Sequence, residues 1–368
     1  MRNKKIIVYT ENPEEELRKK LLQYTYKAHI RKYFERNFEK LPENWEELSE
    51  IISSSILQAD EYFLLSANAS LYTAPLLLYY GTINLALGTA TLLTGNKITI
   101  NGHGMKALPD YTSPDVGNTK VHFVSPKDGG VSVYLNKIGK LDVNLTELPD
   151  WTLRELLLSI PELYLEAVQC YDTYESYCFP LETVITEDRT FERISDDHTE
   201  CSRLLDLLHE VPNFENRYVV PQLINADNNK MLLLNYKYQS EPICYQSHTG
   251  QSFLLRGHLC GKKLIVLPQW ANMYSALFML SSLCRYEPRK WNRFITYDES
   301  GEKLLIEKFI YLARRLLPNM LLSYIEKCQY TFEDKKYEPT SKINILGEHE
   351  IKTLIDREMD RRICDEKF

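Results

Sequence analysis

The sequence lacks the short motifs that mark the common catalytic and metal sites. It contains no phosphate-binding P-loop, no GxGxxG dinucleotide fingerprint and no GxSxG nucleophile elbow. None of its 8 histidines is spaced as HxxxH or HExxH, and its 8 cysteines include no CxxC pair. We therefore expect neither a bound metal ion nor a cofactor.

Features of a secreted chain are also missing. The cysteines are widely separated and form no disulfide framework, which is typical of free, buried thiols in a reducing compartment. The N-terminal segment contains only one short apolar run, Ile6–Tyr9, which is too short for the hydrophobic part of a signal peptide. These observations predict a cytoplasmic protein.

The composition is that of a globular protein with ample core. The 368 residues are 44% hydrophobic and 26% charged, enough for one large domain or two ordinary ones. A net charge of −7 argues against a nucleic-acid footprint spread over the whole surface. A local basic patch stays open, because basic residues cluster at Arg31, Lys32 and Arg36 and again between Arg285 and Arg293.

A stretch without any charged residue, from Tyr62 to Asn96, organises the predicted fold. We expect a helix that begins at Pro75 and ends at Gly95, since proline suits a first helical turn and glycine a left-handed stop. The stretch is long enough to span a membrane, but polar residues interrupt it. We therefore interpret it as the buried core helix of a soluble protein, not as a membrane segment.

One face of this helix carries small or polar residues. Gly81, Asn84, Gly88 and Thr91 fall at i, i+3, i+7 and i+10, which places them on a single stripe. Small residues along one face let a partner helix approach closely. Asn84 on this stripe would be either a buried polar link between helices or part of a ligand site.

The remaining pattern predicts an α+β fold. Helices of the N-terminal part (1–96) and the C-terminal part (269–330) form one helical layer, in which the charge-free helix 74–94 and the nearly uncharged helix 271–286 pack together. Between them, residues 97–268 are rich in short, mostly antiparallel strands, with one central helix over 151–172 and a hairpin around SPKDGG (125–130). Residues 331–368 form a charged tail.

Two segments together resemble the YaaC-like family of bacterial proteins. The first is APLLLYYGTINLALGTATLLTG followed by GHGMKAL, and the second is SALFMLSSLCRYEPRKWNRF with its RYxPxxW pattern. LRELLLSIPELY (Leu153–Tyr164) matches a third recurrent segment of that family. The resemblance covers about residues 15–330. It implies a protein whose relatives are largely uncharacterised, some of them associated with mobile or defence-type gene sets, and it carries over no catalytic residues.

A partial resemblance to HEPN-type helical domains covers residues 62–106. Many such domains are metal-independent RNases that use an Arg-x4–6-His motif on a later helix. The only close match here is Arg203–His209 (RLLDLLH), which lacks the usual polar residue after the arginine and falls in the β-rich region. Because six residues do not return to one helix face, these two side chains converge only if the helix bends or a second subunit completes the site.

The candidate ligand site lies at two predicted helix ends. His103 has glycines on both sides, which suits either a ligand site with unusual backbone angles or a turn in which the imidazole caps a carbonyl. Arg285 would hold a phosphate or carboxylate with Tyr286 or Trp291 stacked on a ring, or else cap its own helix and pair with Glu287.

The function predicted from these observations is a binding or interaction component, in the setting of a bacterial defence or stress system. A nucleotide or RNA ligand and a protein partner are the expected partners. An RNase using Arg203 and His209 and a structural homodimer remain the alternatives.

Overall fold

The computed structural model describes residues 4–125, 127–171, 177–185, 190–194, 208, 210–212, 214–218, 222–226, 229–234, 245–248 and 250–333. The chain divides into two compact units, each treated separately below. The first comprises Met1–Asp172 and His258–Lys335, and the second comprises Thr173–Gly257 and Lys336–Phe368. Helices accompanied by several small, mostly antiparallel sheets confirm the predicted α+β class.

The N-terminal part of the first unit is helical after one short strand. Its elements are β1 (Lys4–Tyr9), α1 (Pro13–Leu22), η1 (Gln23–Thr25), α2 (Lys27–Asn37), α3 (Trp45–Ala67) and α4 (Ala74–Thr94). The sequence accounts for the start of α1, since the Asn12 side chain accepts a hydrogen bond from the Glu15 amide at 3.2 Å and Pro13 occupies the first turn. Such local signals set helix boundaries before any tertiary contact forms.

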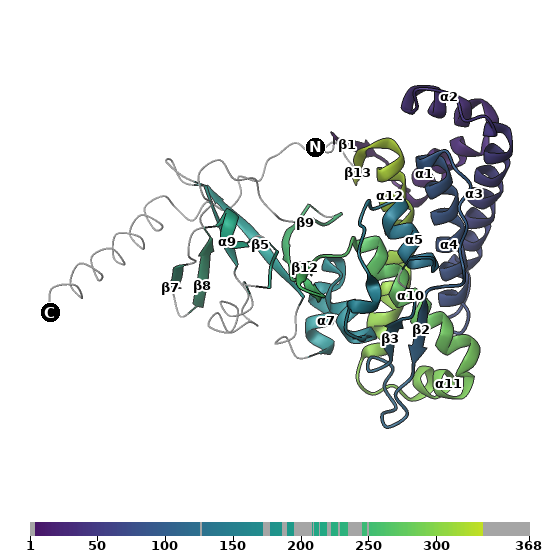
Figure 1. Cartoon of the computed structure of the whole chain (residues 1–368). Helices are drawn as coiled ribbons and strands as arrows, with labels where there is room; N and C mark the ends of the chain where they lie inside the picture. The colour runs from purple at the N-terminus through teal and green to yellow at the C-terminus, as the bar shows by residue number, and fades with distance from the viewer. Residues whose placement is uncertain are drawn as a thin grey trace. The chain divides into compact units, whose positions relative to one another are not determined.

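The charge-free helix α4 confirms two predictions: where the helix begins and ends, and that its stripe of small residues lets another helix approach closely. Pro75 lies in its first turn, and Gly95 ends it with φ of 62°. A Cβ placed on Gly81 would lie 3.1 Å from Tyr62 Cβ, and one on Gly88 would lie 3.2 Å from a side-chain carbon of Ile56. The two glycines therefore let α3 and α4 lie side by side at close range (Figure 1).

Two of the three C-terminal helices of the first unit pack against α4. The three are α10 (Gln269–Tyr286), α11 (Pro288–Tyr297) and α12 (Glu302–Glu326), which contains Pro318. Both α10 and α12 contact α4, so the predicted packing of 74–94 against 271–286 is present. By length and composition α4 would pass for a membrane span, but 61% of its apolar window is buried within the protein, as in a core helix.

Short elements of the middle segment complete this unit. They are the antiparallel sheet β2 (Met105–Leu108), β3 (Lys120–Phe123) and β4 (Trp151–Thr152), the hairpin β11 (His258–Cys260) and β12 (Lys263–Ile265), and the helical pieces α5 (Gly130–Lys137), η2 (Leu145–Glu147), α6 (Leu153–Leu158), η3 (Pro161–Leu163) and α7 (Tyr164–Cys170). The helix expected over 151–172 is thus interrupted at Pro161, because proline cannot continue a helix without losing a main-chain hydrogen bond.

The predicted hairpin around 125–130 is wrong. The segment before it forms β3, but this strand pairs with β2 and β4, and the segment after it forms the helix α5. The run Gly130–Leu135 is buried without interruption, so its alternating Val, Ser and Val do not face core and solvent in turn. Burial on all sides overrides the strand preference of such residues.

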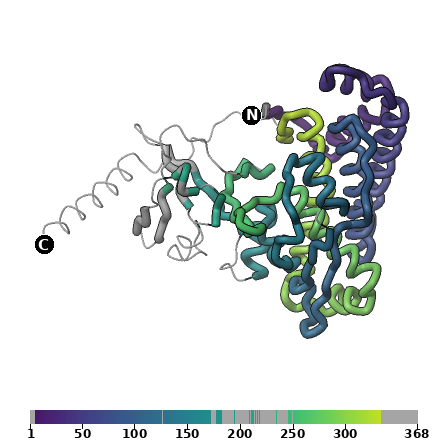
Figure 2. Tube along the Cα trace, in the orientation of Figure 1, coloured from purple at the N-terminus to yellow at the C-terminus, as the bar shows by residue number. Residues whose placement is uncertain are grey.

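The two ends of the first unit meet in a small parallel sheet. Strand β1 pairs with β13 (Cys328–Glu333), with Lys4 opposite Cys328 and Tyr9 opposite Glu333. Figure 2 shows this pairing as the purple and yellow ends of the coloured tube lying side by side. Segments distant in sequence are therefore joined through main-chain hydrogen bonds, which closes the helical unit.

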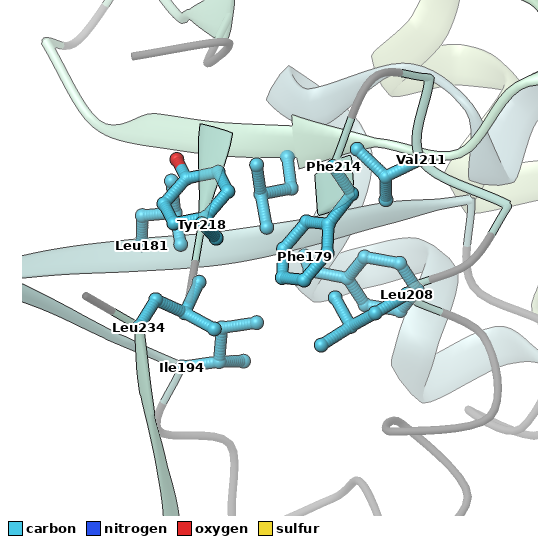
Figure 3. Packing of buried hydrophobic residues seen from close by; sticks show 9 residues of the cluster. Phe179, Leu181, Ile194, Leu208, Val211, Phe214, Tyr218 and Leu234 are labelled. Carbon is cyan, nitrogen blue, oxygen red and sulfur yellow. The ribbon is translucent and has the colours of Figure 1, made fainter. Parts of the chain in front are cut away.

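The second unit contains a six-stranded antiparallel sheet in the order β7-β8-β6-β5-β10-β9. The elements are β5 (Cys178–Ile185), β6 (Thr190–Ile194), α9 (Phe214–Arg217), β7 (Gln222–Ala226), β8 (Asn229–Leu234), β9 (Tyr245–Gln246) and β10 (Ser252–Leu255). Its core gathers Phe179 and Leu181 from β5 with Phe214 and Tyr218, as Figure 3 shows. This sheet has its own hydrophobic cluster, as a compact unit requires.

Candidate functional site

Two neighbouring tyrosines of α4 bring together the residues that the sequence singled out. The Tyr79 hydroxyl lies 2.8 Å from Nδ1 of His103, and the Tyr80 hydroxyl accepts a hydrogen bond from Nη1 of Arg285 at 3.1 Å. His103 lies in the loop after α4, whereas Arg285 lies in the last turn of α10. The packing of α4 on α10 therefore places the imidazole and the guanidinium in one region of the first unit.

The loop that carries His103 depends on its glycines. Gly102 and Gly104 have φ angles of 71° and 76°, in the left-handed region that favours glycine. A Cβ on Gly104 would lie 2.8 Å from the Cα atom of Gly129. Main-chain bonds lock the contact, since the Gly130 amide donates to the Gly102 carbonyl at 3.0 Å. The group that approaches this backbone is thus a second loop of the same chain.

His103 is half-buried and neutral at pH 7. Burial and, next, the positive charge of Arg285 lower the pKa of its imidazole below the ordinary value of 6.5. The Tyr79 hydroxyl interacts both with Nδ1 of His103 and with the hydroxyl of the buried Tyr274. If Tyr79 donates to Nδ1, the proton of the neutral imidazole lies on Nε2, which is then a hydrogen-bond donor; if Tyr79 accepts, the proton lies on Nδ1 and Nε2 is an acceptor.

Arg285 carries a charge that no carboxylate balances in the part of the chain that the structure describes. Its Nε donates to the Ser281 carbonyl at 3.2 Å, which is the predicted capping of its own helix. Among the described residues nothing accepts from its Nη2, and Glu287, the predicted ion-pair partner, instead accepts from the Tyr111 hydroxyl. One edge of the guanidinium therefore stays available for an anion.

The aromatic neighbours of Arg285 differ in access. Tyr286 is 69% exposed, and its ring centroid lies 4.8 Å from Arg285 Cζ. Trp291, the other residue predicted to stack on a ligand, is only 1% exposed and packs on Phe294 with ring centroids 5.5 Å apart. Of these two residues, Tyr286 can offer a ring face to a bound molecule, whereas Trp291 is a core residue of α11.

Asn84 lies on α4 beside this region but does not link two helices. Its amide donates to the Tyr80 carbonyl of the same helix at 2.9 Å, and the side chain is half-buried. This back-bonding satisfies the polar group locally. Asn84 is therefore satisfied within α4, one turn from Tyr80, and makes no hydrogen bond with Arg285 or His103.

A sequence model of the YaaC-like protein family matches residues 14–325. The chain belongs to the YaaC-like family. The matched region begins within α1 and ends within α12, so it contains His103, Arg285 and both tyrosines of the site. No curated protein and no solved structure matches the chain.

The other predictions for this YaaC-like chain concern the RNase pair, metal binding and the two tyrosines. Arg203 and His209, the candidate RNase pair, lie outside the described residues. In the described ranges, no group of three or more His, Cys, Asp or Glu side chains is arranged to hold a metal ion. Tyr79 and Tyr80 were not predicted as site residues, although two adjacent tyrosines in a charge-free helix are a visible signal, because buried hydroxyls need hydrogen-bond partners.

The proximity of Arg285 to His103 predicts a measurable shift in this YaaC-like protein. Arg285→Gln removes a positive charge that disfavours the imidazolium, so the pKa of His103 should rise. NMR titration of the histidine ring signals measures it, with His103→Gln identifying the resonance. Arg289→Gln, at an exposed position of α11, is the control and should leave the His103 titration unchanged. An unchanged titration in Arg285→Gln would contradict the electrostatic contact.

Proposed function

We propose that this YaaC-like protein binds a small anionic ligand, of the class of a nucleotide or another phosphorylated ring compound, at Arg285, His103 and Tyr286. The observation that carries the proposal is the guanidinium of Arg285, which has no carboxylate partner among the described residues and one unengaged edge. An arginine in this state matches the bidentate geometry of phosphate and carboxylate.

Neighbouring groups suit the two parts of such a ligand. The exposed ring of Tyr286 offers a stacking face for a base, and Nε2 of neutral His103 offers a further hydrogen-bonding group. Lys290 does not add to the positive charge on offer, since its ammonium donates to the carbonyls of Asp110 and Ser113 at 2.6 and 2.8 Å.

The charge balance favours a small ligand over a polymer. Arg289 and Arg293 of α11 are also exposed, but a nucleic-acid backbone needs a longer row of basic residues, and the chain as a whole has a net charge of −7. On this proposal the protein is a cytoplasmic binding component that reports on or holds a small molecule. Its setting in a bacterial defence or stress system rests on the family resemblance alone.

The test is a binding screen with four forms of the full-length protein. AMP, ATP, GTP, pyrophosphate and inorganic phosphate are titrated at low ionic strength by calorimetry and thermal shift. Arg285→Gln should weaken binding about 10- to 100-fold, the value of a charge-assisted hydrogen bond. Tyr286→Ser should weaken the nucleotides but not inorganic phosphate or pyrophosphate, because only a base can stack on the ring.

Arg289→Gln is the matched control, as it removes the same charge from an exposed position four residues on. It should bind every probe as the wild type does. Binding that Arg285→Gln leaves unchanged would show that the site lies elsewhere. Absence of binding by any of the five probes would contradict the proposal itself.

A further inference from the structure

A second region of the first unit contains a cavity, away from the residues of the proposed anion site. Its volume is about 310 Å³, at the small end of the roughly 300–1,000 Å³ range of ligand sites. Helices α1, α3, α4 and α12 line it, and its apolar side chains include Leu17, Ile56, Phe63 and Leu85. Such a lining favours an apolar molecule or the apolar part of one.

The cavity also contains two arginines whose surroundings differ. Arg18 is fully engaged with Asp60 through a bidentate contact, with Nε–Oδ1 at 2.7 Å and Nη2–Oδ2 at 3.0 Å. Among the described residues, Arg314 of α12 makes no bidentate contact and forms only a longer ion pair with Glu14. Its nearest carboxylate, that of Glu14, lies 3.7 Å from Nη2, beyond hydrogen-bond distance.

Arg314 is therefore a mostly buried cation with unused donors. Its side chain is 16% exposed, and its Nε is buried without a hydrogen-bond partner. A desolvated donor without an acceptor costs free energy, and an acceptor supplied by a ligand would remove that cost. The other acidic groups of the lining are already paired, since Glu15 contacts Lys19 at 3.1 Å. The group that the cavity lacks is thus a hydrogen-bond acceptor for Arg314.

From these contacts we infer that the cavity binds a small amphipathic carboxylate, with its carboxylate on Arg314 and its alkyl body among the apolar side chains of α1, α3 and α4. The planar guanidinium matches a carboxylate in two parallel hydrogen bonds. Glu14, which is more exposed than Arg314, swings to solvent when the ligand takes its place. The small volume suits a medium-length alkyl chain more than a large ring system.

Octanoate, 1-octanol and octylamine are suitable probes, because they share one alkyl chain and differ in the head group. Each is titrated against the full-length protein by calorimetry. Octanoate should bind saturably and at least about 10-fold more tightly than octanol, from its charge-assisted hydrogen bonds to Arg314. Arg314→Met keeps the apolar stem and removes the donors, so it should reduce octanoate affinity to that of octanol.

Two further variants keep the result interpretable. Ala67→Phe fills the rim of the cavity from an exposed position on α3 and should abolish binding of octanoate and octanol alike. Arg36→Met removes an exposed arginine of α2 that does not line the cavity and should change nothing. Equal octanoate affinity in wild type and Arg314→Met, tighter binding of octylamine, or absence of saturable octanoate binding would overturn the inference.

The outcome is independent of the anion site on α10. Arg285→Gln should leave octanoate binding intact, and Arg314→Met should leave nucleotide binding intact, because the two arginines lie on different helices and share no contact residue. Octanoate binding that Arg285→Gln abolishes would place the carboxylate at the other site and contradict the assignment to Arg314.

Discussion

Glu302→Ala is expected to lower the free energy of unfolding by about 3–6 kcal/mol, because it leaves three buried hydrogen-bond donors without an acceptor. Glu302 is the first residue of α12 and is only 1% exposed. Its Oε2 accepts from the amides of Val116 and Gly117, both at 2.9 Å, and its Oε1 accepts from the Tyr171 hydroxyl at 2.6 Å. A single carboxyl group thereby joins the loop before β3, the end of α7 and the start of α12.

The matched control is Glu302→Gln, which keeps the shape and the acceptor oxygen. Its carbonyl oxygen can accept from both amides, and its amide group can donate to the Tyr171 hydroxyl. Urea unfolding of the two variants and the wild type measures the difference. If Glu302→Gln lost as much stability as Glu302→Ala at pH 7.5, the negative charge rather than the hydrogen bonds would hold this junction together.

The same pair reports on pH. Burial raises the pKa of the Glu302 carboxyl above its ordinary value of 4.5. The folded state then holds the proton more tightly than the unfolded state, so this group's contribution is full below pH 4.5 and is lost as pH rises through the folded pKa. Glu302→Gln does not titrate, and its stability relative to the wild type should therefore improve as pH increases from 4.5.

Local sequence signals predicted the helices and strands of the first unit better than they predicted the contacts between those elements. Pro75 and Gly95 act through their own backbones, so the bounds of α4 follow from the sequence. The fully buried run that begins at Gly130 shows the opposite case, because alternation of Val and Ser is informative only if one face meets solvent. Nothing local to that run reveals that α4 and α10 cover it.

At the candidate site, too, the sequence indicated local backbone features but not the tertiary contacts. The glycines around His103 correctly indicated left-handed backbone angles, but the loop that packs on them lies at Gly129, too distant in sequence for the pattern to show it. Arg285 was placed at a helix end by its position, while its partner Tyr80 follows only from the packing of α10 on α4. The cavity beside Arg314 draws on four helices, and no sequence window contains it.

Gly129→Ala should destabilise the protein by about 3 kcal/mol, at the upper end of the cost of overpacking, because the added methyl group has nowhere to go. Its Cβ would lie 2.3 Å from the Cα atom of Gly104 and 2.9 Å from the Gly104 nitrogen, both main-chain atoms that no rotamer change can move. Relief requires the two loops to separate, which breaks the bond from the Gly130 amide to the Gly102 carbonyl.

A neighbouring glycine provides the control for Gly129→Ala. Gly102 has a φ of 71°, but a Cβ there would meet nothing within 4 Å. Gly102→Ala should therefore lower the free energy of unfolding only by the cost of placing alanine in the left-handed region, about 1–2 kcal/mol. Chemical denaturation of both variants separates steric overlap from backbone preference. Because separation of the loops also moves His103, Gly129→Ala should weaken its hydrogen bond with Tyr79 and shift its NMR titration, whereas Gly102→Ala should preserve both. Equal destabilisation by the two substitutions would mean that the loops do not meet at Gly104 and Gly129.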